Sequence, residues 1–444
     1  MRWIRVLEHG RIPVVEDGET PPDGAVNAAE RRRLGHADRW RGAEGGSVFH
    51  WRAHALVARH WVGVLQVPGI SVEILPKIEG GHAAPGGDAE SLAFARQNLL
   101  YMLAVAGDLP LRERDIADLS LQRMPLSETL LALFATRLDE ALRIGVEHGY
   151  VTEEDELPVL RGKLVPARQA AKLPARLDRF ALRFERFCED TPLNRILKAA
   201  CRAGLHAEPA AGTGHTLRRC VGVLDDVADL PVPQLGLDRV QLTRQNERFR
   251  TLFNFARLIL GQQAPTASSG ATRTFSLLFD MNAVFERFVA GFLQRYVLPA
   301  FPAITLRAQA RGYGLHLLNR GETGVLRLKP DLVLTDGTAN LLVVDTKWKR
   351  LDAARREIRP SREDLYQMFA YAHRFQCSRN ALLYPLMEGL EPHDYAVPDP
   401  SGARIGVRFI GLSRDLRANR KELADELVTL LARELGIEPV ERAA

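Results

Sequence analysis

Cysteines and long apolar runs are both scarce in this sequence. No stretch of about 18 uninterrupted apolar residues, the length that a bilayer-spanning helix needs, occurs among its 444 residues. The opening segment MRWIRVLEHGR has no apolar core followed by a small-residue cleavage site, so we expect no export signal. The four cysteines, Cys188, Cys201, Cys220 and Cys377, lack C-x-x-C spacing, which favours free thiols in a reducing cytoplasm over disulfides or a zinc site.

Two common site motifs are also missing. The glycine clusters at 42–46 and 79–87 do not contain G-x-x-x-x-G-K-[ST], so the chain by itself is not expected to hydrolyse nucleotides. Its 12 histidines form neither H-x-H nor H-E-x-x-H, which gives a histidine-bound zinc site no support. The net charge of +5 permits a polyanionic partner without requiring one.

The composition that is present indicates a globular protein of several domains. Hydrophobic residues make up 46% of the chain and charged residues 26%, and the length suits roughly two to four domains. We predict an α/β multidomain protein with a β-rich unit at 1–88, a mainly helical unit at 89–265 and an α/β unit at 266–444. The Gly/Pro-rich segment 79–88 and the small-polar segment 266–273 mark the boundaries.

Local patterns agree with this division. Residues 61–78 have the pattern of a hairpin with a Pro-Gly turn at 68–69. A strand is expected at 180–187, and a helix begins at Asp190 or Thr191 with Pro192 in its first turn. Apolar residues at helical spacing predict further helices at 91–105, 127–145 and 242–260.

The most informative segment is VLRLKPDLVLTDGTANLLVVDTKWKR at 325–350. Two apolar runs, 332–334 and 341–344, flank a polar turn that contains Asp336 and Gly337, and this pattern predicts a β-hairpin.

The register of this hairpin would bring two carboxylates together. If the loop is 336–340, Thr335 pairs with Leu341, and the same register sets Asp331 opposite Asp345. Opposed residues lie about 4.5–5.5 Å apart at Cβ. Two carboxylates at that separation can share one Mg²⁺ ion, which prefers oxygen ligands, and an oxygen site of this kind also accepts Mn²⁺.

A lysine completes a minimal hydrolytic set. Lys347 lies two residues beyond Asp345 and therefore points to the same face of the strand. Its ammonium can orient and help deprotonate the attacking water, or stabilise charge on the phosphate. Two acids for a metal and one lysine for the water are the minimum for hydrolysing a phosphodiester.

Two helices are expected to support the site. The helix at 280–297 has one apolar face, and Glu286 lies at the border of that face, from which it can reach the metal as a third carboxylate. A later helix has Ser361 as its N-cap, and Gln367 and Tyr371 lie on one face of it and can both bear on the site. The buried stripe of that helix is predicted to be Leu365, Met368, Phe369 and Ala372.

The spacing of these residues is similar to a known nuclease pattern. Pro330-Asp331, followed by Asp345-x-Lys347 and by Gln367-x-x-x-Tyr371, resembles the PD-(D/E)XK nucleases with a RecB-like Q-x-x-x-Y motif. More narrowly, several ordered segments resemble the McrC family, the nuclease subunits of McrBC modification-dependent restriction systems. These segments are 62–78, 194–200, 281–289, PDLVL with VVDTKWK, 364–372 and 382–385.

The resemblance assigns roles to the candidate residues. It implies a C-terminal restriction-endonuclease-like α/β domain of the PD-(D/E)XK type. Asp331 and Asp345 would bind the metal, Lys347 would be catalytic, and Gln367 and Tyr371 would form the auxiliary motif. Glu286 is the candidate for a third metal ligand.

The resemblance also implies a partner and a substrate. McrC-like proteins work with McrB, a hexameric AAA+ GTPase that recognises modified DNA and translocates. The chain would then be a magnesium-dependent endonuclease subunit that cleaves double-stranded DNA carrying modified bases and stimulates the partner GTPase. Its N-terminal and helical regions would dock on the ring, with 1–88 as the docking domain.

The sequence is also compatible with two other functions. The chain could be an adaptor that activates the AAA+ partner with little cleavage of its own. It could instead be a stand-alone DNA repair or recombination nuclease of the same superfamily. A set of basic residues after the active-site strand could bind DNA phosphates or form a solvated loop, and its members are Lys349, Arg350, Arg355, Arg356, Arg359 and Arg362.

Overall fold

The N-terminal sheet combines strands from distant parts of the sequence. Its order is β1 (Arg2–Leu7), β6 (Ile70–Leu75), β5 (Trp61–Val67) and β10 (Phe275–Asp280). The β5–β6 pair is the predicted hairpin, and β1 pairs with β6 in parallel. The computed structural model describes residues 1–15, 21–78, 89–111, 124–171, 178–238, 240, 242–244, 246–261, 275–309, 313–349, 360–398 and 402–440.

The fourth strand comes from the range predicted to form the C-terminal unit. β10 pairs with β5 antiparallel, with Leu278 opposite Gly63. A glycine is required there because Gly63 has a φ of +125° and a Cβ on it would lie 1.9 Å from the carbonyl oxygen of Leu277. The predicted division at 265/266 therefore does not coincide with the limits of the sheets.

A second, smaller sheet and a helix accompany this N-terminal sheet. The sheet has the order β2 (Arg11–Pro13), β4 (Ala55–Ala58) and β3 (Phe49–Arg52). The helix α1 (Ala28–Gly45) begins with a capping box between Asn27 and Glu30.

The middle of the chain is largely helical, as predicted. The helix α6 (Pro192–His206) begins after Thr191, whose side chain accepts a hydrogen bond from the backbone N–H of Asn194. The predicted helix at 242–260 is shorter, because a 3₁₀ turn at Glu247–Phe249 precedes it. Other helices described in this region are α2 (Ala89–Ala106), α4 (Leu126–Ile144), α7 (Ala211–Val223) and α8 (Arg250–Gly261).

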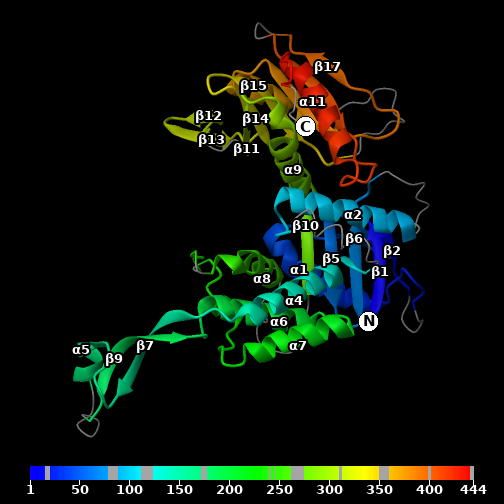
Figure 1. Cartoon of the computed structure of the whole chain (residues 1–444). Helices are drawn as coiled ribbons and strands as arrows, with labels where there is room; N and C mark the ends of the chain where they lie inside the picture. Colours follow the sequence, from blue (N-terminus) through cyan, green and yellow to red (C-terminus); the bar gives the residue numbers. More distant parts are fainter. Residues whose placement is uncertain are drawn as a thin grey trace.

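An antiparallel arm extends from the helical layer (Figure 1). The strands β7 (Gly149–Leu157) and β9 (Phe180–Cys188) pair along their whole length, and β9 includes the strand predicted at 180–187. β8 (Lys163–Leu164) and the short helix α5 (Pro166–Ala170) complete the arm. Hereafter "the arm" denotes 149–188.

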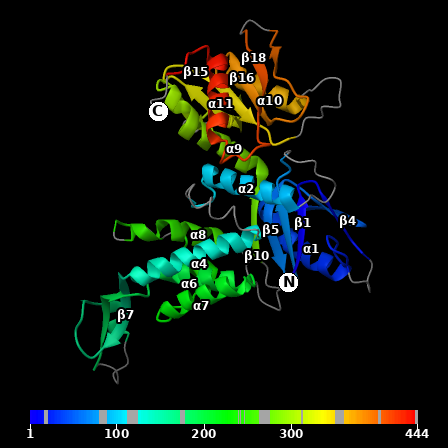
Figure 2. The same cartoon turned by 45° about the vertical axis from the view of Figure 1, so that its right-hand side comes forward.

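The C-terminal unit is a six-stranded mixed sheet between helices. α10 (Arg362–Arg374) covers one face, where Met368 packs with Val333 and Val343. α9 (Met281–Phe292) and α11 (Arg420–Leu435) cover the other face, and a π-helical turn follows α9 (Figures 1 and 2). The strand order is β11 (Thr305–Ala308), β14 (Leu332–Thr335), β15 (Asn340–Thr346), β16 (Arg379–Pro385), β18 (Arg404–Ile410) and β17 (His393–Ala396).

A two-stranded ribbon leads into this sheet, and one hydrophobic core joins the units. The ribbon consists of β12 (His316–Arg320) and β13 (Thr323–Arg327). The core is continuous from the N-terminal sheet through α2 and α4 to α9 and α11. The prediction of a mixed α/β multidomain protein is confirmed. None of the helices in the described part of the chain has the length and apolar composition needed to cross a membrane.

Candidate active site

The register of β14 and β15 brings Asp331 and Asp345 together. The two strands are antiparallel, with Leu332 opposite Val344. Continued by one residue, this register sets Asp331 opposite Asp345, as the sequence predicted. The pair lies where β15 ends and its parallel neighbour β16 continues toward Pro385.

The other end of the same hairpin differs from the prediction. Thr335 pairs with Asn340, so the predicted pairing with Leu341 and the longer loop are wrong. The cause is an irregularity after Leu334, where the register shifts. Asp336 closes the shorter turn by accepting two backbone N–H hydrogen bonds at 2.8 Å. The shift lies beyond Leu334 and leaves the aspartates in register.

The two aspartates are held in different ways. Asp331 Oδ2 accepts hydrogen bonds from the backbone N–H and the hydroxyl of Thr346, both at 2.7 Å. Asp345 is 2% exposed. Its Oδ2 lies 2.6 Å from Lys347 Nζ and, apart from this ion pair, has no hydrogen-bond partner among the residues that the structure describes. A buried carboxylate in this state is stabilised by additional positive charge.

Lys347 connects the aspartates to α10. Its ammonium donates a hydrogen bond to Gln367 Oε1 at 2.9 Å, and Gln367 Nε2 donates to the hydroxyl of Tyr371 at 2.8 Å. Asp364 also lies 3.5 Å from the ammonium. The structure therefore brings Gln367 and Tyr371 to the lysine from one face of the helix, as the spacing of four predicted.

Negative charge is crowded at this strand end. Burial, and then the charge of Asp331, raises the pKa of Asp345 to about 7. Burial also raises the pKa of Asp331, although the hydrogen bonds from Thr346 act to lower it. Burial alone would lower the pKa of Lys347, but the surrounding carboxylates, Asp345 foremost, raise it. The lysine is therefore held protonated by the acids beside it.

Glu286 stands near this pair on α9, half-buried. Burial, followed by the charge of Asp331, raises the pKa of Glu286. Gln309, which the sequence did not single out, bridges the two regions, because its side chain bonds Glu286 and its backbone N–H donates to Asp331 O at 2.6 Å. Gln309 has a φ of +53°, a backbone conformation that the sequence pattern does not predict.

The chemistry of these donors fits a hard divalent cation. Asp331 and Asp345 supply carboxylate oxygens, one of them buried and unpartnered except by the lysine, and Mg²⁺ is commonly held by one or two carboxylates with water and phosphate oxygens. Within the described ranges, no three His, Cys, Asp or Glu side chains are grouped closely enough to hold a metal by themselves. The fit therefore depends on the aspartate pair, and Glu286 as a third ligand stays a prediction.

The helix α10 is capped as predicted, but its buried face is rotated. Ser361 Oγ accepts a hydrogen bond from the backbone N–H of Asp364 at 3.1 Å. Met368 and Ala372 are buried, whereas Phe369 is 45% exposed, so its place in the predicted stripe was wrong. Tyr371 is buried instead, because the face that carries the motif also packs on the sheet.

The structure describes two members of the predicted basic set, Lys349 and Arg362. Lys349 Nζ lies 3.1 Å from Asp364 Oδ1, and Arg362 is exposed on the first turn of α10. The other four members, Arg350, Arg355, Arg356 and Arg359, lie outside the described residues. DNA contact by this set stays a prediction.

Comparison with protein families identifies the chain. Residues 56–385 match the family of McrBC 5-methylcytosine restriction system components, which is well over half of the sequence. The chain belongs to the McrBC family. The resemblance to McrC drawn from the ordered segments is thereby confirmed.

Individual McrBC proteins resemble the chain at low sequence identity. The Type IV methyl-directed restriction enzyme EcoKMcrBC of Escherichia coli (strain K12) is 21% identical over 354 residues, which cover 74% of this chain and 96% of that protein. A refined half-complex from a tetradecameric assembly of Thermococcus gammatolerans McrB AAA+ hexamers with bound McrC matches with a TM-score of 0.64. It is 23% identical and covers 95% of this chain and 99% of the matched chain, so it shows a shared fold.

Proposed function

We propose that the chain is the endonuclease subunit of an McrBC-like modification-dependent restriction system. The proposal depends on one observation above all, the convergence of Asp331, Asp345 and Lys347 at the end of β15. Its C-terminal unit, a mixed sheet between helices, would be a PD-(D/E)XK nuclease domain. Its substrate would be double-stranded DNA that carries modified bases.

Asp331 and Asp345 would hold Mg²⁺, or Mn²⁺ in its place. When bound, such an ion polarises the phosphate and lowers the pKa of a coordinated water. Lys347 lies beside Asp345 and can donate to a phosphate oxygen or orient the water whose oxygen bonds to phosphorus. As that bond forms, the ester P–O bond breaks and the leaving oxygen takes up a proton.

Gln367 and Tyr371 would position the lysine. Gln367 accepts one proton of the ammonium and Asp345 Oδ2 lies 2.6 Å from it, which fixes its rotation and leaves its third proton to point toward water or phosphate. Burial, and then the charge of Asp345, raises the pKa of Tyr371, so its hydroxyl stays neutral. Because this hydroxyl accepts from Gln367 Nε2, it holds the amide in the orientation that presents its oxygen to Lys347.

The partner would be a hexameric AAA+ GTPase of the McrB type. The solved relative is described as McrB AAA+ hexamers with bound McrC, and the fold of this chain matches it over nearly its full length. The predicted docking region was 1–88 together with the helical region. The arm would be a further docking surface for this partner, because it exposes large apolar side chains that water does not favour, namely Tyr150, Val159, Leu160, Leu164 and Phe187.

The decisive experiment is cleavage by the complex with its GTPase partner on methylated DNA. We expect Lys347→Ala to abolish cleavage while stimulation of the partner GTPase persists. Lys421→Ala removes an exposed lysine of α11 and serves as the matched control, with wild-type cleavage expected. Wild-type cleavage by the Lys347→Ala complex would refute the proposed mechanism.

The same assay separates the two other functions. An adaptor would stimulate the GTPase without detectable cleavage even in the wild type. A stand-alone nuclease would cut DNA with Mg²⁺ in the absence of the partner. The buried and charged arrangement around Lys347 favours a working active site, and the exposed arm favours a partner. The three units by sequence range and the cytoplasmic location remain part of this proposal.

A further inference from the structure

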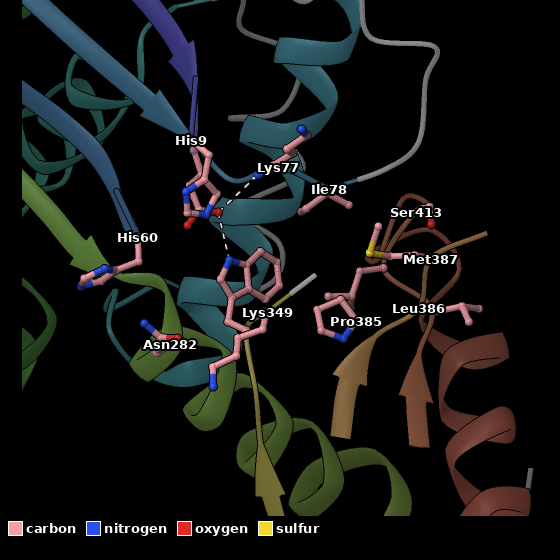
Figure 3. A pocket seen from close by; sticks show the side chains of 13 residues that line it. His9, His60, Lys77, Ile78, Asn282, Lys349, Pro385, Leu386, Met387 and Ser413 are labelled. Atoms are coloured by element: carbon pink, nitrogen blue, oxygen red, sulfur yellow. Dashed lines mark hydrogen bonds between the residues drawn. The ribbon is translucent and has the colours of Figure 1, made fainter. Parts of the chain in front are cut away.

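The residue after the lysine connects the site to the N-terminal sheet. Trp348 Nε1 donates a hydrogen bond to Glu8 Oε2 at 2.9 Å, drawn as a dashed line in Figure 3. The ring of Trp348 also packs against Phe285, with 5.3 Å between centroids. Phe285 precedes Glu286 on α9, so Trp348 is in contact with two elements that carry or flank the site.

Residues 347–349 directly follow β15, and their side chains make contacts on alternating sides of the chain. Lys347 and Lys349 both face α10, where Asp364 lies 3.5 Å and 3.1 Å from their ammonium groups. Trp348, between them, faces Glu8 and α9. The backbone N–H of Lys347 also donates to Leu383 O at 2.9 Å. If the contact of Trp348 is lost, one side of this segment is free to shift.

Glu8 is an acidic residue in a buried position. It is 2% exposed, and its Oε2 also accepts the backbone N–H of Lys77 at 3.3 Å. Its Oε1 is buried and has no hydrogen-bond partner in the part of the chain that the structure describes. Glu8 borders a cavity of about 400 Å³ that also adjoins Trp348 and Pro385. A carboxyl group buried in this way lowers folding stability rather than adding to it.

We propose that Glu8 is a positioning residue for the proposed cleavage reaction. Through the indole N–H of Trp348 it fixes the segment 347–349, and with it the Lys347 ammonium relative to Asp331 and Asp345. This inference depends on the proposed function. It makes the geometry of the nuclease site depend on a residue in the turn that follows β1, 340 positions away in sequence.

The test compares four variants in the complex with the GTPase partner on methylated DNA. Glu8→Ala and Trp348→Phe each remove one side of the hydrogen bond. Glu8→Gln keeps an oxygen that accepts from Trp348 and Lys77. Gln66→Ala is the matched control, because it removes a buried polar side chain from the adjoining N-terminal sheet. The amide of Gln66 donates to Ala207 O, away from the site.

We expect Glu8→Ala and Trp348→Phe to lower kcat for cleavage by about tenfold to a hundredfold. KM for DNA and the stimulated GTPase rate should stay unchanged, because Glu8 is buried, Trp348 is half-buried and neither lies in the arm. Glu8→Gln and Gln66→Ala should keep wild-type cleavage. The double variant Glu8→Ala/Trp348→Phe should be no slower than either single one, since both remove the same contact.

Three outcomes would overturn the inference. Wild-type kcat in Glu8→Ala, while Lys347→Ala is inactive, refutes the positioning role and leaves the proposed function standing. An equal loss in Gln66→Ala shows a general effect of the sheet and refutes it too. If the wild-type complex does not cleave, or Lys347→Ala cleaves normally, the proposed function fails and the inference fails with it.

Discussion

The end of β15 and the arm differ in which side chains are buried and which are exposed. At the strand end, polar groups from β14, β15 and α10 converge on Lys347, and nearly all of them are buried or half-buried. In the arm, apolar side chains face water: Tyr150 is 72% exposed and Phe187 59%. Buried polar convergence is the arrangement of a chemical site, and exposed apolar surface is that of a docking site.

The two regions are also stabilised differently. Ion pairs link the two long strands of the arm on its exposed surface, such as Arg183 with Glu154 at 2.6 Å and Arg186 with Glu153 at 2.7 Å. Exposed pairs of this kind contribute little free energy, so the arm depends on its ladder of backbone hydrogen bonds. The strand end lies on the hydrophobic core of the C-terminal unit. Variants should therefore separate the two activities.

The largest effect is expected at the aspartate pair. Asp345→Asn keeps the side-chain volume but removes the charge that would hold the cation and the lysine. Cleavage should fall by at least about 10³-fold, the loss of several kcal/mol of transition-state stabilisation. GTPase stimulation should stay at the wild-type level. A parallel loss of both activities in Asp345→Asn would break the proposed separation of the two regions.

The arm should give the complementary result. Tyr150→Ser/Phe187→Ser removes two exposed aromatic side chains that contact each other, with 5.1 Å between centroids. We expect partner binding to weaken by about 2 kcal/mol or more, roughly 30-fold in Kd, measured by titration with the GTPase. Cleavage at saturating partner should be normal. Val440→Ser, an exposed apolar residue outside the arm, is the control and should bind normally.

A smaller effect is expected from the amide behind the lysine. Gln367→Leu keeps the size of the side chain but removes the acceptor for Lys347 and the donor to Tyr371. Cleavage should fall by about tenfold, with kcat rather than KM affected. Single-turnover cleavage at several DNA concentrations measures this. An increase in KM alone would show that Gln367 contacts DNA and does not position the lysine.

The last two predictions concern stability and its dependence on pH. Burial raises the pKa of Glu8 from 4.5 to about 8, so the folded protein binds this proton more tightly and loses stability as pH rises between those values. Glu8→Gln removes this dependence, and its melting temperature should exceed that of the wild type increasingly toward pH 8.

The arm supplies a contrasting variant. The Arg183 hydrogen bond lowers the pKa of exposed Glu154, so its contribution is present above the unfolded pKa and lost as pH falls through the folded one. Glu154→Gln should therefore be slightly less stable than the wild type near neutral pH and equal to it in acid. Identical pH profiles for Glu8→Gln and Glu154→Gln would contradict the contrast between buried and exposed acids.

The core of the site was predictable because it is local. A two-residue strand period and a polar turn sufficed to place Asp331 opposite Asp345 and Lys347 on the same face. The spacing of Gln367 and Tyr371 also followed from helix geometry. The pairing of Thr335 with Asn340 could not be predicted, because the register shift after Leu334 leaves no strong signal in the sequence.

The rest depended on contacts between distant parts of the chain. The segment FSLLFD at 275–280 has the pattern of a strand. Nothing in this pattern indicates that the strand pairs with β5. The exposure of Phe369 followed from how α10 is rotated on the sheet. The contact of Trp348 with Glu8 spans 340 positions and has no local pattern at all.

Metal binding by the intact protein tests the central claim most directly. Mn²⁺ titration followed by electron paramagnetic resonance, with Mg²⁺ as competitor, should detect a site in the wild-type chain. We expect Asp331→Asn and Asp345→Asn each to weaken that site at least about tenfold, and Lys421→Ala to leave it unchanged. Unaltered Mn²⁺ binding in both aspartate variants would contradict a cation site at the end of β15.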